Sequence, residues 1–221
     1  MATDLRIRAV AAIGDIPAAA WDACANPTAA AHPASSPPAY NPFISHAFLH
    51  ALEISGSATA RTGWQPQHLI VETAEGSVVG AMPCYLKSHS RGEYVFDHGW
   101  ADAYERAGGD YYPKLQVSVP FTPATGRRLL VAPAAPAADI ETALAAGLME
   151  LTRLRRASSA HVTFATQHEW QLLGEHGFLQ RTDQQFHWSN AGYPTFDAFL
   201  SALASRTVSY THLTLPTNRE V

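Results

Sequence analysis

The segment from His89 to Gly126 brings together side-chain types that a binding or catalytic site needs. It reads HSRGEYVFDHGWADAYERAGGDYYPKLQVSVPFTPATG and combines Trp, Tyr, His, Asp, Glu, Arg and Lys. A buried core is usually poorer in titratable groups, because each buried charge needs a partner. Aromatic residues interleaved with such groups are typical of a binding surface. We therefore expect the functional site within this segment.

Asp97 and His98 are the candidate catalytic residues. In the functional interpretation one of them acts as a general base, and Trp100 and Tyr104 form walls of the substrate site. In the alternative interpretation Asp97 caps a helix, the two aromatic side chains pack, and Glu105 is solvated. An isolated Asp-His pair does not decide between the two.

Lys114 enters a predicted strand directly after two tyrosines. With Tyr112 it is a candidate for holding a carboxylate or phosphate of the substrate, and the alternative is an ordinary solvated lysine. Thr125, Gly126 and Arg127 are the candidate cofactor-binding residues, because together they could grip a phosphate.

The sequence before the long predicted helix gives no support for a coenzyme A site. That helix follows VAPAAPAAD, residues 131–139, which has no glycine and contains two prolines that lack an N–H group. A pyrophosphate cradle at a helix N-terminus depends on free backbone N–H groups. No cofactor is therefore evident from these residues.

Composition excludes several other classes of function. The chain has 221 residues, 47% hydrophobic and 15% charged residues, and a net charge of -4, which fits a globular protein and gives no reason to expect DNA binding. No run of about 20 apolar residues predicts a membrane span. The histidines lack paired ligand spacing, so we expect no metal site. The two cysteines form no CxxC, which favours a reducing compartment and the cytoplasm.

The hydrophobic periodicity and turn signals predict an α+β fold, a mixed sheet flanked by helices. A short helix should follow Pro17, Ser45 should cap another, and Asp139 and Thr195 should cap two more. Further predicted elements are a helix over 167–176 and strands over 6–13, 68–73, 77–86, 115–121, 128–131, 161–165 and 180–188.

Several longer segments resemble the FemAB-like, GNAT-related acyltransferases, which are described as peptidoglycan biosynthesis or recognition proteins. The segments that carry the resemblance are NPFISHAFLHALEISGSA, GEYVFDHGWADAYERAG, YYPKLQVSVPFTPATGRRLLV, QFHW and GYPTFDAFLSALASR, in this order from Asn41 to Arg206. The resemblance implies a GNAT-like fold as one unit of a two-unit family. It also implies an acyl-CoA or an aminoacyl-tRNA as the donor for the full-length family.

The resemblance predicts a division of the chain. Residues 1–193 would form the GNAT-like N-terminal unit, with an Ala/Pro-rich loop over 25–40, and residues 194–206 would begin a second unit that is missing. The ending TVSYTHLTLPTNREV, residues 207–221, resembles translated adapter sequence and is expected to be foreign, with a natural tail as the alternative. An apolar stripe over 196–203 would then be exposed and would favour self-association.

Together these observations predict the N-terminal half of an N-acyltransferase or aminoacyltransferase that acts on an amine of a cell-wall precursor or a related metabolite. As a half, it would be inactive alone. The alternative is a non-catalytic domain that recognises a peptidoglycan-type ligand through the same aromatic and charged residues. An intact single-unit acetyltransferase is the third possibility, and the glycine-free loop counts against it.

Overall fold

The computed structural model describes residues 4–28 and 38–203. The chain divides into two compact units, residues 1–180 and 181–221. The expected foreign tail and most of the Ala/Pro-rich loop lie outside the described residues. The helices of the first unit are α1 (Ala18–Ala25), α2 (His46–Ile54), α3 (His98–Arg106), α4 (Ala137–Leu154) and α5 (Gln167–Glu175), with single 3-10 turns η1 (Ile13–Asp15), η3 (Pro42–Ile44) and η4 (Ala60–Thr62).

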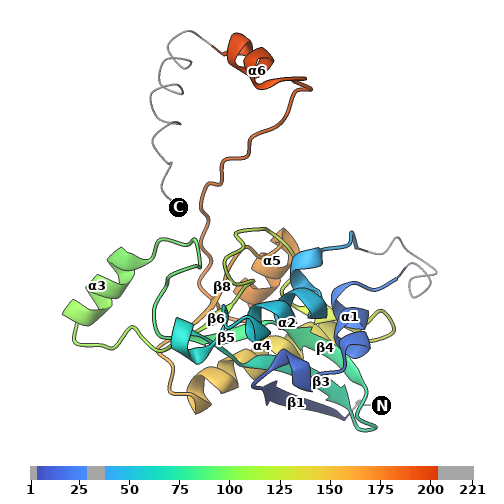
Figure 1. Ribbon diagram of the computed structural model, residues 1–221. Coiled ribbons are helices and arrows are strands. Elements are labelled where there is room, and N and C mark those ends of the chain that lie inside the picture. Colours follow the sequence, from blue (N-terminus) through green and yellow to red (C-terminus); the bar gives the residue numbers. More distant parts are fainter. Residues whose placement is uncertain (1–3, 29–37, 204–221) are drawn as a thin grey trace. The chain divides into compact units, whose positions relative to one another are not determined.

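The described strands of the first unit form two four-stranded sheets (Figure 1). The first sheet has the order β1-β3-β4-β7 and is antiparallel throughout, and the second has the order β2-β5-β6-β8 with one parallel pair, β6 and β8. The strands are β1 (Leu5–Val10), β2 (Trp64–Pro66), β3 (His68–Thr73), β4 (Val78–Met82), β5 (Cys84–Lys87), β6 (Lys114–Val117), β7 (Leu130–Val131) and β8 (Ala160–Val162). This is the predicted α+β class, consistent with a GNAT-like fold.

One long hairpin connects the two sheets. Its turn lies at Gly76, whose φ of 84° is readily adopted only by glycine. The strand predicted over 77–86 is wrong in one respect, because Pro83 divides it into β4 and β5, which belong to different sheets. Proline has no N–H to donate to a ladder, and opposite the break the Gln67 N–H bonds the Cys84 carbonyl at 2.8 Å.

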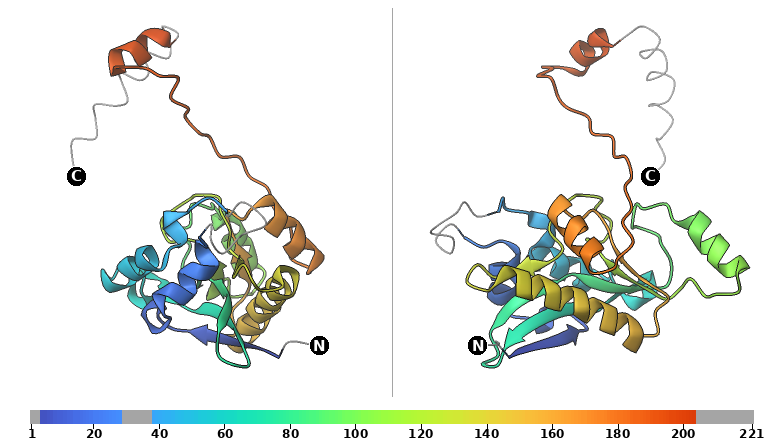
Figure 2. Two further views of the ribbon diagram at one scale, coloured as in Figure 1. Left: turned by 90° about the vertical axis from the view of Figure 1, so that its right-hand side faces the viewer. Right: turned by 180° about the vertical axis from the view of Figure 1, so that it is seen from behind.

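The strands of the first sheet alternate between two apolar cores. Ile70 and Ala81 pack with Trp21 of α1 and Leu49 of α2. On the other face Leu69, Val71 and Met82 pack against α4 through its predicted inner stripe of Ile140, Leu144, Leu148 and Leu151. Because strand side chains alternate, α1 and α2 cover one face and α4 covers the other. Figure 2 shows α4 running along the sheet.

Side chains cap α2 at the predicted residue and also cap α5. The Ser45 hydroxyl accepts from the Phe48 N–H, and Thr166 forms a capping box with Glu169 at the start of α5. Asp139 lies in the first turn of α4 but does not cap it, since the helix begins after Pro136. There the acidic side chain still interacts favourably with the helix dipole.

The strand predicted over 180–188 is wrong. These residues are extended and pair with no strand in the described part of the chain, and Phe186 and Trp188 are 86% and 67% exposed. A strand needs a neighbour that takes its N–H and C=O groups, and this largely polar segment has no such neighbour among the described residues. In the second unit, Thr195 caps α6 (Phe196–Ala202) as predicted, with Leu200 buried and Phe196 exposed.

Two further features complete the first unit. The helix α3 projects away from both sheets (Figures 1 and 2). None of the described helices is long and apolar enough to cross a membrane.

The structure predicts a large role for Glu169 in stability. Its buried carboxylate accepts from the Arg128, Leu129 and Thr166 N–H groups at 2.5, 2.7 and 3.0 Å. Glu169→Ala leaves these donors without an acceptor, and we expect a loss of about 3–5 kcal/mol in urea unfolding. The matched control is Glu175→Ala on the exposed end of the same helix, which should change stability by less than about 0.5 kcal/mol. Equal losses in the two variants would contradict this role.

Candidate functional site

The strand β6 has one apolar and one polar face. Leu115 and Val117 point into the core under α4, whereas Lys114, Gln116 and Ser118 alternate with them on the opposite face. All three polar side chains are buried. The second sheet therefore carries buried polar groups on the face that, in the first sheet, is apolar.

Lys87 and Lys114 lie directly opposite each other in the β5–β6 ladder. They are the only two lysines of the chain, and both side chains are fully buried. Lysine is almost never fully buried unless it is paired. Two lysines facing each other in the interior therefore need nearby carboxylates.

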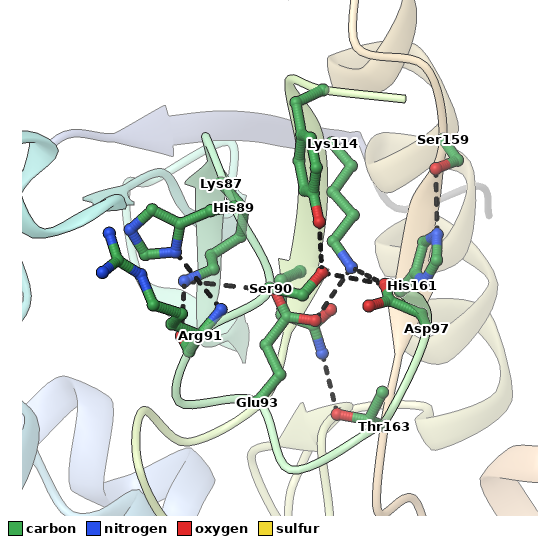
Figure 3. Close-up of polar contacts among 12 residues, drawn as sticks. Lys87, His89, Ser90, Arg91, Glu93, Asp97, Lys114, Ser159, His161 and Thr163 are labelled. Atoms are coloured by element: carbon green, nitrogen blue, oxygen red, sulfur yellow. Dashed lines mark hydrogen bonds and ion pairs between the residues drawn. The ribbon is translucent and has the colours of Figure 1, made fainter. Parts of the chain in front are cut away.

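The segment that follows β5 supplies those carboxylates. Lys114 Nζ lies 2.8 Å from Glu93 Oε2 and 2.5 Å from Asp97 Oδ2, and Lys87 Nζ lies 4.0 Å from Glu93 Oε1. Figure 3 shows Lys114 pointing between the two acidic side chains. We call Lys87, Glu93, Asp97 and Lys114 the ionic cluster.

Asp97 is the most strongly bound member of the ionic cluster. Its Oδ2 also accepts from the Ser90 hydroxyl and the Tyr111 hydroxyl, both at 2.9 Å. Burial raises the pKa of Asp97, but the hydrogen bonds from Lys114, Ser90 and Tyr111 outweigh it and lower the pKa below its ordinary value. A carboxylate held in its charged form in this way is a weak base.

The pKa values of Glu93 and Lys87 are shifted toward each other. Burial raises the pKa of Glu93, and its attraction to Lys114 and Lys87 offsets only part of that effect. Burial lowers the pKa of Lys87 to about 7, with Glu93 opposing the shift and Lys114 adding to it. The two shifts bring the pKa values of the carboxyl and the ammonium group closer together, a direction that favours acid–base chemistry.

Unpartnered polar atoms gather on the same face. Among the described residues, six buried side-chain polar atoms have no hydrogen-bond partner, and five of them lie here: Tyr85 OH, Glu93 Oε1, Asp97 Oδ1, Gln116 Oε1 and Ser118 Oγ. Buried polar atoms are usually satisfied by protein, water or ligand. Their concentration at one place makes this polar face the candidate site, because such atoms can accept hydrogen bonds from water or a ligand.

An open pocket of about 630 Å³ adjoins the ionic cluster. Its lining residues are Leu52, Ser57, Arg61, Thr62, Trp64, His89, Arg91 and Phe121. Lys87 Nζ lies 3.3 Å from the centre of the Trp64 ring, and both Lys87 Nζ and Trp64 Nε1 donate to the Arg91 carbonyl, at 3.4 and 3.2 Å. Trp64 thus contacts Lys87 and also borders the pocket.

Comparison with protein families gives one match, which covers most of the chain. A family model described as FemAB_like, peptidoglycan biosynthesis/recognition, matches residues 12–209. The chain belongs to the FemAB-like family. No curated protein and no solved structure matches it.

The structure brings together three of the six residues that we proposed as catalytic or substrate-binding in this FemAB-like chain. Asp97 and Lys114 are in direct contact, and the Tyr112 hydroxyl lies 2.7 Å from Ser90 Oγ, which in turn bonds Asp97. His98, Trp100 and Tyr104 belong to the projecting helix α3 instead and are exposed. Tyr104 reaches back only to the Tyr111 ring, with ring centres 6.1 Å apart.

Two of the alternative interpretations are wrong. Asp97 occupies the N-cap position of α3, but its side chain makes no capping bond, and its Oδ2 instead bonds Lys114, Ser90 and Tyr111. Lys114 is fully buried, so it is not an ordinary solvated lysine. Glu105, by contrast, is exposed, as the alternative interpretation expected.

The donors of the predicted phosphate grip are largely occupied. The Gly126 N–H donates to the Phe164 carbonyl at 3.0 Å, and the Arg127 guanidinium donates to the carbonyls of Cys24 and Ala25. Thr125 is exposed. A phosphate at this segment would have to displace these bonds. Among the described residues, no group of acidic, cysteine and histidine side chains could hold a metal ion.

Sequence reasoning missed Lys87, Glu93 and the pocket residues Arg61, Trp64 and Arg91. One signal was available, because a chain whose basic residues are nearly all arginine uses lysine only twice. Both lysines stand at the end or the beginning of a predicted strand. Their pairing across β5 and β6 was not readable, because strand register depends on tertiary contacts.

The first prediction for the site concerns the protonation of Lys87. Because the chain has only two lysines, lysine-labelled protein gives two sets of side-chain NMR signals, and Lys87→Met identifies the set that belongs to Lys87. That set should titrate near pH 7, since burial lowers its pKa to about 7. A titration near the ordinary lysine value of about 10.4 would contradict the burial of an ammonium group here.

The same shift predicts a pH dependence of stability. Between pH 7 and 8.5 the unfolded chain keeps the Lys87 proton while the folded chain releases it, so stability rises with pH. We expect a gain of about 1–2 kcal/mol in urea unfolding over this interval. In Lys87→Met the gain should be absent, whereas in Arg153→Gln, which changes an exposed cation of α4, it should persist.

The third prediction tests the pairing in the ionic cluster. Lys114→Met leaves Glu93 and Asp97 buried without their shared cation, which should cost about 3–5 kcal/mol. Adding Glu93→Gln and Asp97→Asn removes the uncompensated charges and should recover part of this loss. A triple variant that is less stable than Lys114→Met alone would show that the charges are not coupled.

Proposed function

We propose that this chain forms an amide bond on an amine of a peptidoglycan precursor, as an N-acyl or aminoacyl transferase. The ionic cluster is the observation that carries the proposal. In such a reaction the acceptor amine attacks the acyl carbonyl, a C–N bond forms, and the bond to the donor oxygen or sulfur breaks. The attacking amine must lose a proton, and a nearby group must take it.

Glu93 and Lys87 are suited to handle that proton. Glu93 Oε1 has no hydrogen-bond donor within bonding distance, and burial raises the pKa of this carboxyl group. Lys87 Nζ is 4.0 Å away, and its pKa is lowered to about 7. Asp97 acts as a positioning residue in this scheme, because it holds Lys114 and thereby Glu93 in place.

The donor would be an acyl-CoA or an aminoacyl-tRNA. The described residues offer no evident phosphate cradle, because α4 begins after Pro136 and the donors of Gly126 and Arg127 are engaged. This supports a second candidate function, recognition of a peptidoglycan-type ligand without catalysis. In that case the ionic cluster would only fix the shape of the site.

We also propose that the reaction takes place in the cytoplasm. Cys24 and Cys84 are both free and buried, and burial raises the pKa of each thiol to about 12. A thiol with so high a pKa is protonated and unreactive at neutral pH. Free buried cysteines fit a reducing compartment, where peptidoglycan precursors receive their amide-linked groups.

The test measures amide formation on a muropeptide that carries a free amine, with acyl-CoA or aminoacyl-tRNA as labelled donor. We expect product by mass spectrometry, and Glu93→Gln should lower the rate by about 100-fold or more, because it removes the proton acceptor. The control is Glu105→Gln, an exposed position on α3, which should leave the rate within twofold.

Two outcomes would count against transfer. Muropeptide binding with no product from either donor would favour recognition without catalysis. A rate in Glu93→Gln within twofold of the parent, in a variant that unfolds at the same urea concentration, would exclude Glu93 from the reaction.

A further inference from the structure

The pocket beside the ionic cluster has an unbalanced charge. Of its lining residues, Arg61 and Arg91 are cations, and none is acidic. Neither guanidinium makes an ion pair with any of the described residues. Two arginines that face one cavity without carboxylates attract an anion, and a guanidinium binds carboxylate or phosphate through paired N–H groups.

A third cation lies directly behind the pocket wall. Lys87 Nζ sits 3.3 Å from the centre of the ring of Trp64, a fully buried residue that borders the pocket. Lys87 itself is surrounded by Glu93, Lys114, Arg91 and Asp97. An additional negative charge in the pocket would favour its charged form.

His89 contributes shape rather than charge. Its Nδ1 accepts from the Arg91 N–H at 3.2 Å. Burial, followed by the neighbouring Lys87 and Arg91, lowers the pKa of His89 below its ordinary value, so the ring is neutral at pH 7. The positive charge of the pocket at this pH therefore comes from its arginines.

Aromatic rings form the apolar part of the same pocket. Trp64 and Phe121 have ring centres 5.5 Å apart, and the Phe121 N–H donates to the Gly92 carbonyl at 3.1 Å. Phe121 has a left-handed φ of 59°, which is unfavourable for an aromatic residue and is retained mainly where the surroundings demand it. Planar rings next to cations suit a ligand that combines a flat or apolar part with an anionic group.

Two glycines allow side chains that line the pocket to pack closely against the backbone. A Cβ on Gly63 would lie 2.3 Å from His89 Nε2, and a Cβ on Gly92 would lie 2.6 Å from the Phe121 ring. Both glycines also have positive φ, 74° and 80°. The walls of the pocket are thus fixed by backbone geometry and do not need a ligand to form.

We propose that this pocket binds a carboxylate or phosphate group joined to a planar or apolar moiety. Arg61 and Arg91 hold the anion, and the exposed ring of Phe121, which packs on the buried Trp64, contacts the rest of the ligand. The proposal is independent of the transfer activity, since it concerns binding alone. It holds equally for a substrate, a product or a regulatory ligand.

The experiment titrates lysine- and tryptophan-labelled protein with phenyl phosphate and, separately, with benzoate. Both probes should shift the Trp64 indole N–H signal, assigned with Trp64→Phe, and should move the midpoint of the Lys87 titration upward. The relative affinity of the two probes shows whether phosphate or carboxylate is preferred. Phenyltrimethylammonium, which has the ring but a positive charge, should give no shift.

Variants locate the site. Arg61→Gln and Arg91→Gln change exposed side chains, so both should fold, and each should weaken phenyl phosphate binding at least tenfold. Arg153→Gln, which removes an equally exposed arginine from α4, is the matched control and should bind as the parent does.

Three results would overturn the proposal. The first is that 10 mM of either probe leaves the Trp64 indole N–H signal unshifted. This concentration is about 100 times a dissociation constant of 0.1 mM and would saturate the site. The second is an equal loss of binding in Arg153→Gln, which would indicate attraction by net charge alone. The third is a shift of Trp64 without any change at Lys87, which would put the anion elsewhere.

Discussion

The burial of two lysines against two carboxylates is the constraint on which this part of the molecule depends. Moving an ion out of water costs several kcal/mol, and only close partners offset that cost. Lys114 has two carboxylates within 2.8 Å, whereas Lys87 has one at 4.0 Å and an aromatic ring at 3.3 Å. The path of the chain from Lys87 to Asp97 is therefore dictated by the need to deliver Glu93 and Asp97 to Lys114. The start of α3 follows from the position of Asp97.

The long hairpin carries an apolar surface in the first sheet and, on the same side, a polar surface in the second sheet. On the face with Ile70 and Ala81, α1 and α2 exclude water from the first sheet. Beyond Pro83 the same side of the hairpin presents Tyr85 and Lys87, while the opposite side stays apolar under α4. The helix α4 thus packs against the apolar faces of both sheets, and the strands hold the polar groups on a rigid backbone. A site built on strands keeps its geometry better than one built on loops.

Local sequence signals predicted the elements, but tertiary pairing decided how they are used. The caps at Ser45 and Thr195, the turn at Gly76 and the stripe on α4 depend on neighbours in sequence, and all were readable. The strand predicted over 180–188 has no partner strand among the described residues, and the segment is largely polar apart from Phe186 and Trp188. For the site, the composition of the 89–126 segment drew attention to Asp97 and Lys114, which lie in direct contact. Glu93 and Lys87 were missed, because their importance comes from burial and from strand register, neither of which a single sequence displays.

The choice of lysine over arginine in the ionic cluster distinguishes it from the pocket next to it. An arginine keeps its charge in almost any environment, and Arg128, although buried, satisfies its guanidinium with carbonyl oxygens of Ala124, Arg127 and Thr163. A lysine can lose its proton when it is desolvated, and burial lowers the pKa of Lys87 to about 7. The pocket presents fixed charges at Arg61 and Arg91, whereas the interior holds a charge that can be gained or lost. Trp64 and the Arg91 carbonyl contact Lys87, and both residues also line the pocket. A change of charge in the pocket therefore alters the electrostatic potential at Lys87, and the reverse also holds. The pocket carries permanent charges, and the charges of Lys87 and Glu93 next to it depend on protonation. An anion bound by the two arginines can therefore change the protonation of Lys87 and Glu93.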